Sequence, residues 1–418
     1  MLRVYTSLFS HEEYGQYNLV LSTLGLMKVF SITWLSASAI RFYQQYKKQN
    51  QLSLFSSSLF YAVVSSSVLI GVVVYMINKF LLKTTFHPRL FSLLNIAIVA
   101  SVFIAVFEVF VLLFRADLKP QKYILFWLLY VAGKPIVALL LIFGWGMRVS
   151  SVFWGFLGIS AILSILIFFM IENVDIRPCN VSQRCFSQFV TFGFPIAFTN
   201  LSMWFLSMFD RYLLEVFRSS SEVGLYAVGY TISEKTLQLT FMTLMLAAYP
   251  IIVDNWETKG VESTRELIRA ISRYYMILLT PLLVILVSMP KDICLVFTDS
   301  NFVAGAKVLP FIACGFYLLG LSQYILKGFE LKQKSIDIAK VAIIAVMANM
   351  GSNVILIPRF GYLGASISSL VGYVIYFFAA LLFSRKVLRW QPPLQSVQNI
   401  FIAALIMGLL IMASNFVS

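Results

Sequence analysis

Three lysines, Lys28, Lys134 and Lys235, lie inside long apolar stretches of the 418-residue chain. A charged side chain is costly in hydrocarbon, so such residues are functional candidates when they face a cavity between helices. Their ammonium groups can make charge-assisted hydrogen bonds to an anion that has left water. Alternatively, each lysine extends along its apolar stem to a membrane interface. The long distance to either interface favours a cavity for these three, whereas Lys307 and Lys340 lie near the ends of their stretches and are expected to reach water.

Two carboxylates, Glu108 and Glu234, also lie well inside apolar stretches. They could couple function to an ion gradient; the alternatives are that each is neutral or paired with a cation on another helix. Glu234 directly precedes Lys235, and adjacent residues do not face each other on a helix, so no ion pair is expected between them. Asp210 and Arg211 lie at the outer end of a stretch and are expected to form an interfacial pair or part of a gate.

The apolar stretches that carry these residues dominate the composition, which is 60% hydrophobic and 12% charged. Soluble domains carry about 25% charged residues, whereas about 20 apolar residues in a helix cross a membrane. The stretches do not alternate as the strands of a membrane barrel would, so we expect an all-α, polytopic membrane protein. Twelve spans are expected, at residues 17–40, 53–78, 91–114, 123–147, 150–171, 188–209, 223–253, 274–289, 304–326, 336–358, 362–384 and 397–417.

Lysines and arginines are unevenly divided between the two sets of alternate loops, with about twice as many in one set. The positive-inside rule places this set, which includes residues 41–52 and 254–273, in the cytoplasm. The formal net charge of +14 is therefore a topology signal, and nucleic acid is not expected as a partner.

Signals of an enzyme are absent from the sequence. The longest loop, residues 254–273, is too short for a folded catalytic domain. The two histidines and four cysteines lack the spacing of metal ligands, so neither a metal nor another cofactor is expected.

An internal repeat divides the chain in two, because the pattern E-x-G-x-Y occurs at residues 13–17 and again at residues 222–226. The alternative is two coincidental helix starts. Six spans separate the copies, and this even number implies halves that cross the membrane in the same direction. We expect the glycine to free the turn that enters each helix and the tyrosine to sit at the interface. The expected lobes are residues 1–187 and 188–418.

The repeat belongs to a series of motifs, which also includes residues 12–17 (EEYGQY), 192–195 (FGFP), 210–212 (DRY), 223–226 (VGLY) and 353–365 (NVILIPRFGYLGA). In their order and spacing the chain resembles the polysaccharide exporters, or Wzx-type O-antigen flippases, of the multidrug/oligosaccharidyl-lipid/polysaccharide (MOP) superfamily. The resemblance implies two pseudo-symmetric, MATE-like helical lobes. In this family a transmembrane helix precedes the first motif, whereas only residues 1–10 precede it here, so that helix is expected to be missing or reduced to its last turns.

The resemblance further implies translocation of an undecaprenyl-diphosphate-linked oligosaccharide across the bacterial inner membrane, for O-antigen or other surface polysaccharide. The diphosphate would be bound by Lys28, Lys134 and Lys235. Membrane lipid is an expected partner, and a glycan polymerase and a chain-length regulator are further candidates.

Two other functions remain open: a cation-coupled exporter of small cationic drugs with the same fold, and a membrane glycan polymerase or transferase. An exporter of cationic drugs needs acidic residues at mid-membrane, but cations outnumber acids inside the spans. A polymerase is expected to have a sizeable outer loop, and none of the expected outer loops is long.

Overall fold

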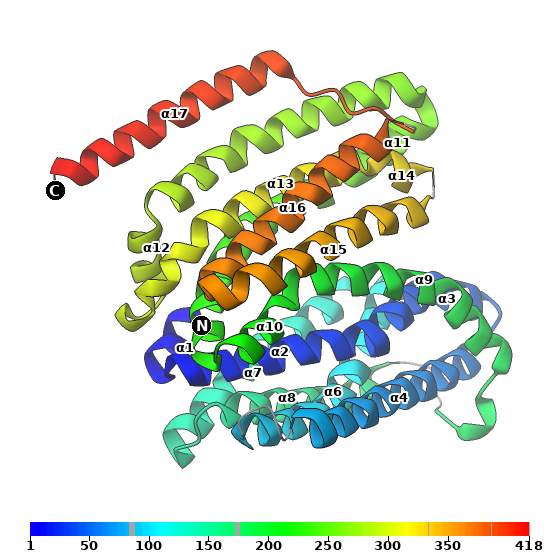
Figure 1. The fold of residues 1–418 in the computed structure, drawn as a ribbon. Helices are drawn as coiled ribbons and strands as arrows, with labels where there is room; N and C mark the ends of the chain where they lie inside the picture. The colour runs from blue at the N-terminus through cyan, green and yellow to red at the C-terminus, as the bar shows by residue number, and fades with distance from the viewer. Residues whose placement is uncertain (83–87, 172–175, 333, 386, 418) are drawn as a thin grey trace. The chain divides into compact units, whose positions relative to one another are not determined.

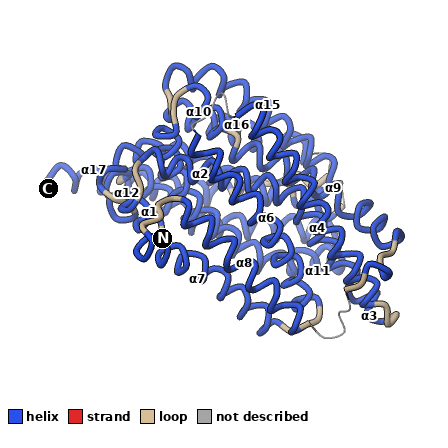
Figure 2. The backbone as a smooth tube through the Cα atoms, turned by 90° about the horizontal axis from the view of Figure 1, so that it is seen from below, coloured by secondary structure: helices blue, strands red, loops and turns tan. Residues whose placement is uncertain are grey.

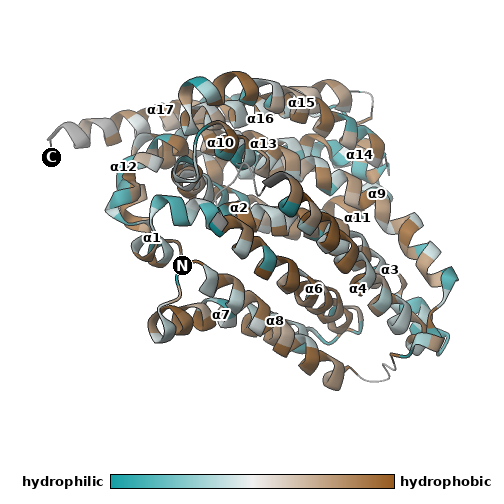
Figure 3. Ribbon diagram, turned by 60° about the horizontal axis from the view of Figure 1, so that its bottom comes forward, coloured by the Kyte–Doolittle hydropathy of each residue, from teal (hydrophilic) through white to brown (hydrophobic). Residues whose placement is uncertain are grey.

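The computed structural model describes residues 1–418 except 83–87, 172–175, 333, 386 and 418. All regular elements in this described part are helices (Figure 2). Eleven of them are long and apolar enough to cross a membrane. Hydrophobic residues predominate along these helices (Figure 3). Large apolar side chains are exposed on them, such as Leu128 on α7 (Pro120–Trp145) and Phe169 on α8 (Ser150–Met170), which suits contact with lipid tails. The protein is a multi-pass membrane protein.

Two compact units make up the chain. The first comprises residues 16–204 together with Met1, and the second comprises residues 2–15 and 205–418. The helices that lie wholly or mostly in the first unit are α2 (His11–Lys28), η1 (Val29–Thr33), α3 (Trp34–Lys48), α4 (Leu52–Ile77), η2 (Asn78–Leu82), α6 (Pro88–Ala116), α7 (Pro120–Trp145), α8 (Ser150–Met170), η3 (Pro178–Asn180) and α9 (Gln183–Met208) (Figure 1).

The second unit contains a short N-terminal helix and the C-terminal helices. These are α1 (Leu2–Leu8), α10 (Asp210–Phe217), α11 (Ser220–Ser288), α12 (Pro290–Phe297), η4 (Ser300–Val308), α13 (Leu309–Ile325), α14 (Lys327–Leu331), α15 (Ser335–Phe360), α16 (Tyr362–Ser384) and α17 (Leu394–Val417) (Figure 1).

Each of the twelve spans expected from hydrophobicity falls on a helix. These twelve spans correspond to only eleven long helices because α11, with 69 residues, contains two of the expected spans. Gly260 interrupts α11 with non-helical backbone angles, φ 78° and ψ −168°. Because φ is positive there, only glycine adopts this turn without strain. Asn255, before the turn, donates a hydrogen bond to Ser263 after it (3.1 Å).

The division between the units lies within α9, at residues 204 and 205, whereas the sequence places a lobe boundary between 187 and 188. The first part of α9 packs on α3. The Ser38 hydroxyl donates a hydrogen bond to the carbonyl oxygen of Phe189 (3.2 Å). A Cβ atom on Gly193 would lie 2.3 Å from the carbonyl oxygen of Trp34, so the helices approach closely there. This packing accounts for residues 188–204 belonging to the first unit.

The glycines of the E-x-G-x-Y repeat contact each other within the second unit. A Cβ atom on Gly15 would lie 1.7 Å from the carbonyl oxygen of Ser220, and one on Gly224 would lie 2.2 Å from that of His11. Both glycines lie inside helices, so the expectation that they free a turn is wrong: they permit a close helix crossing. Tyr226 of the second copy is fully buried, so its hydroxyl does not reach water as an interfacial tyrosine's would.

Candidate functional site

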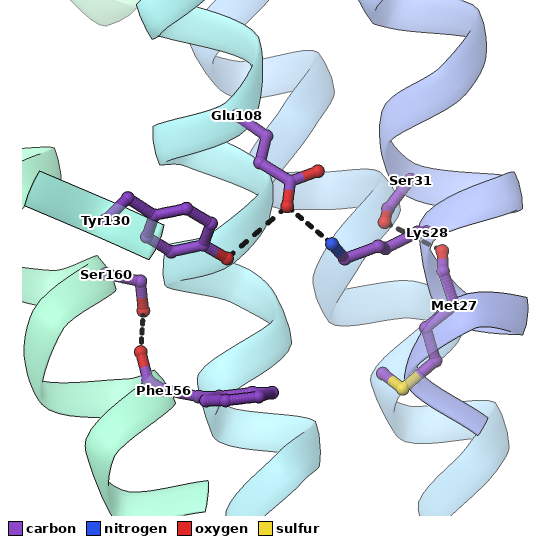
Figure 4. Close-up of polar contacts among 7 residues, drawn as sticks. All are labelled: Met27, Lys28, Ser31, Glu108, Tyr130, Phe156 and Ser160. Atoms are coloured by element: carbon purple, nitrogen blue, oxygen red, sulfur yellow. Dashed lines mark hydrogen bonds and ion pairs between the residues drawn. The ribbon is translucent and has the colours of Figure 1, made fainter. Parts of the chain in front are cut away.

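Three of the charged residues predicted from the sequence converge in the first unit. The Lys28 Nζ atom, at the end of α2, lies 2.5 Å from Oε1 of Glu108 on α6 (Figure 4). The Tyr130 hydroxyl on α7 donates to the same oxygen at 3.3 Å. Lys134, one turn further along α7, places its Nζ 3.9 Å from the centroid of the Tyr130 ring and 4.9 Å from that of Phe156. We call these five residues the lysine cluster.

Local sequence explains how the helices present the lysine cluster. The five-residue π-helical segment η1 follows Lys28 directly, and such segments are frequent at functional sites. On α7, Tyr130 and Lys134 are four residues apart and therefore share a face. Gly155 brings α8 close to α7, because a Cβ atom there would lie 2.8 Å from the carbonyl oxygen of Lys134. This approach brings Phe156, the next residue, to the ammonium group.

The charges of the lysine cluster do not balance. The cluster contains two ammonium groups and one carboxylate, so it carries one net positive charge when all three are ionised. Among the described residues Lys134 has no carboxylate partner, and the faces of Tyr130 and Phe156 stabilise its charge instead. The side chain of Lys28 is 36% exposed and that of Glu108 is 14% exposed. An anion could therefore reach Lys28 and replace Glu108 as its partner.

Two further predicted residues, Glu234 and Lys235, lie on α11 in the second unit. Lys235 Nζ and Glu234 Oε2 form an ion pair at 3.3 Å. The expectation of no ion pair is wrong, because both side chains are long enough to bend towards each other. The Lys235 side chain is 60% exposed and that of Glu234 is 18% exposed, so the lysine remains accessible to a second anion.

Asp210 begins α10 in the second unit and is fully buried. Its Oδ2 accepts hydrogen bonds from the hydroxyls of Tyr226 (2.8 Å) and Ser369 (2.5 Å), and its Oδ1 accepts from the Asn353 amide (2.6 Å). Burial raises the pKa of Asp210, although these hydrogen bonds and the nearby Arg211 oppose the shift. The carboxyl is thus held inside the protein by α11, α15 and α16.

Arg211 does not form an ion pair with Asp210 within the described structure. Its guanidinium donates instead to the carbonyl oxygen of Ser207 (3.0 Å) and lies 4.7 Å from the centroid of the Tyr230 ring. Arg211 is 3% exposed. The expectation of an interfacial pair is therefore not met, because both residues are buried and take different partners.

The tyrosines and the asparagine that contact these charges are not predicted from the sequence. Tyr130 could have been found from its spacing of four residues to Lys134, which places both on one helix face. Tyr226 and Asn353 lie within motifs that were singled out for the resemblance, but no local pattern connects them with Asp210, 16 and 143 residues away in sequence. In the described ranges, no three His, Cys, Asp or Glu side chains are grouped as metal ligands.

Two protein-family models match the chain. The model described as "Polysaccharide biosynthesis protein" matches residues 1–256, and the model named MatE matches residues 195–355. Among individual proteins, the chain is similar to the "Probable flippase AglR" of Haloferax volcanii, with 23% identity over 264 residues. That match covers 62% of this chain and 54% of the relative.

Solved structures share the fold. A multidrug resistance MATE family transporter of the MOP superfamily, inward-facing, has a TM-score of 0.77 at 12% identity, over 92% of either chain. The lipid II flippase MurJ, inward closed, has a TM-score of 0.76 at 15% identity, over 99% of this chain and 88% of MurJ. The prediction of an all-helical, MATE-like fold is confirmed.

Proposed function

Because the chain belongs to the polysaccharide biosynthesis protein family of the MOP superfamily, we propose that it flips a lipid-linked oligosaccharide across the membrane. The family consists of transporters rather than enzymes. Similarity to a probable flippase and the fold shared with MurJ support the proposal. The single observation that carries the choice of substrate is the lysine cluster, whose net charge is positive.

A diphosphate that leaves water needs new partners for its charge, and ammonium groups supply charge-assisted hydrogen bonds. In the proposed mechanism the diphosphate displaces Glu108 from Lys28 and also contacts Lys134. The rings of Tyr130 and Phe156 cover part of the Lys134 ammonium group, so its attraction for an anion is stronger than in bulk water. Lys235 is proposed as a further substrate-binding residue of the second unit, since most of its side chain is exposed.

The carboxylates have a second proposed role, in gating or ion coupling. Glu108 and Glu234 each neutralise a substrate-binding lysine when no substrate is present, and each loses its lysine partner when the substrate displaces it. Asp210 and Arg211 are proposed to contribute to gating from the buried polar contacts of α10.

The finer proposal is an undecaprenyl-diphosphate carrier in a bacterial inner membrane, for O-antigen or another surface polysaccharide. A glycan polymerase and a chain-length regulator would then act on the product. This part rests on the sequence resemblance, whereas the similar probable flippase is archaeal. The coarser proposal, a lipid-linked oligosaccharide as substrate, does not depend on this part.

A flipping assay in proteoliposomes tests the proposal. A fluorescent polyprenyl-diphosphate sugar is incorporated, and dithionite bleaching from outside measures how much reaches the outer leaflet. We expect rapid flipping by the wild type and a large loss in Lys28→Ala and Lys134→Ala. The matched control is Lys340→Ala, because Lys340 is exposed and paired with Asp337. Full flipping by the Lys28→Ala/Lys134→Ala double variant would refute the substrate-binding role of the two lysines. If the wild type took up a cationic dye and did not flip the lipid, the result would favour a drug exporter.

A further inference from the structure

A cavity of about 390 Å³ lies in the second unit, between the second half of α11 and the start of α17. These helices pack side by side (Figure 1). The residues that line the cavity are mostly polar or charged: Glu266, Arg269, Ala270, Arg273, Tyr274, Pro393, Gln395 and Ser396. It belongs to neither the lysine cluster nor the contacts of Asp210.

Two arginines dominate the charge of this cavity. Arg269 and Arg273 are one helical turn apart, so their side chains share a face of α11 and repel each other. Within the described part of the chain, neither guanidinium has a carboxylate or a hydrogen-bond partner. Glu266 is the only acid among the lining residues, so the cavity keeps a positive charge. An anion between the arginines would relieve their repulsion.

The start of α17 adds to the positive potential. The Val397 amide donates a hydrogen bond to the carbonyl oxygen of Pro393 (2.9 Å), and this bond closes the first turn of the helix. The amides of residues 394–396 precede that bond and have no acceptor within the helix. Residues 395 and 396 line the cavity. The positive end of the helix dipole therefore reinforces the arginines.

The depth of the cavity identifies its occupant. Apolar runs start just after Arg273 on α11 and within the first turns of α17, so the cavity lies where both helices enter the membrane. Tyr274 is 62% exposed there, and Trp390 donates a hydrogen bond to Ser272 (3.2 Å). Tyrosine and tryptophan concentrate at the level of lipid headgroups. The loop charges predict that this end of α11 is cytoplasmic.

We propose that this cavity binds the headgroup of an anionic phospholipid from the cytoplasmic leaflet. The phosphodiester accepts hydrogen bonds from Arg269 and Arg273, and its acyl chains follow the apolar surfaces of α11 and α17 into the membrane. Basic pockets between transmembrane helices on the cytoplasmic side bind anionic headgroups in this way. The site is separate from the proposed flipping site, so either proposal can fail without the other.

Lipid-dependent thermal stability tests this site. The full-length protein is placed in nanodiscs of phosphatidylcholine with increasing phosphatidylglycerol, and its melting temperature is measured. We expect phosphatidylglycerol to raise the melting temperature of the wild type, and its apparent affinity to fall roughly fivefold for each arginine removed in Arg269→Gln and Arg273→Gln. Arg265→Gln is the matched control, because Arg265 is on the same segment, pairs with Glu262 and does not line the cavity.

Three results would overturn the proposal. One is an equal response of the double variant Arg269→Gln/Arg273→Gln and the wild type to phosphatidylglycerol. Another is a shift produced equally by inorganic phosphate, which would identify a site for a free anion. The third is measured on the wild type by native mass spectrometry, which is used if the variants do not fold. The proposal fails if the wild-type protein retains phosphatidylcholine as readily as phosphatidylglycerol.

Discussion

Replacing Glu108 by glutamine removes one charge from the lysine cluster and keeps its shape. The amide oxygen of glutamine can still accept from Lys28 and Tyr130, which both contact Oε1 of Glu108. The net charge of the cluster rises from one to two. Because an incoming diphosphate no longer competes with a carboxylate for Lys28, we expect Glu108→Gln to bind an isoprenyl diphosphate more tightly and to release it more slowly.

The size of the effect follows from the ion pair. At an effective dielectric constant of about 20, unit charges about 4 Å apart attract by about 4 kcal/mol. Fully exposed pairs contribute only about 1 kcal/mol or less. The pair is partly exposed, at 36% for the Lys28 side chain and 14% for Glu108, so an intermediate value applies. We take about 1.4 to 2.8 kcal/mol as the strength of the Lys28–Glu108 ion pair that the diphosphate must replace. Removing this competition corresponds to a roughly tenfold to hundredfold increase in affinity for the diphosphate.

Equilibrium binding of farnesyl diphosphate to the detergent-purified protein measures this affinity. The matched control is Glu330→Gln, which removes the carboxylate 2.6 Å from Lys327 on α14, outside the lysine cluster. We expect tighter binding in Glu108→Gln, unchanged binding in the control and slower flipping only in Glu108→Gln. Unchanged or weaker binding by a folded Glu108→Gln protein would refute the idea that this carboxylate competes with the substrate.

Three further outcomes are expected. Gly224→Ala should destabilise the protein by about 1–3 kcal/mol through overpacking and so lower its melting temperature, because the new Cβ atom would lie 2.2 Å from a backbone carbonyl oxygen. Gly158→Ala is the control and should leave the melting temperature unchanged, because no atom of a neighbouring described segment lies within 4 Å of its Cβ position. Reporter fusions after Gly260 should read cytoplasmic and after Ser300 external, and the reverse would contradict the charge-based topology. Partial burial raises the pKa of Asp117, but hydrogen bonds from two lysines outweigh it and lower the pKa overall. Asp117→Asn should therefore cost less than about 1 kcal/mol at neutral pH, and melting curves should show this difference disappearing as the pH falls through the lowered pKa.

Hydrophobicity predicted the helices well because a membrane span is a local property. About 20 consecutive apolar residues are enough to identify one, and each expected span falls on a helix of the structure. The division into units depends instead on contacts between distant residues. The bond from Ser38 to the Phe189 carbonyl joins α3 to α9, and no pattern within α9 indicates it.

The same distinction applies to the charged residues. Their cost in hydrocarbon identified Lys28, Glu108 and Lys134 one at a time, but the ion pair between Lys28 and Glu108 joins residues 80 apart in sequence. The rule for adjacent residues failed at Glu234 and Lys235 because it describes the directions of the Cβ atoms. Flexible ends of long side chains can still meet, here at 3.3 Å.

The sequence repeat and the charged residues obey different constraints. The repeated glycines, Gly15 and Gly224, contact each other's helices, so each requires the other to remain small. The charges are repeated only in part. Each unit has a lysine–glutamate ion pair, but the lysine cluster of the first unit has a second cation, whereas the second unit buries the carboxyl of Asp210 among neutral donors. The close approach of α2 and α11 therefore accounts for a glycine in both copies of the repeat. This difference in charge fits the different roles proposed for the two sites. The lysine cluster binds the anionic substrate, and Asp210 contributes to gating through its hydrogen bonds to neighbouring helices.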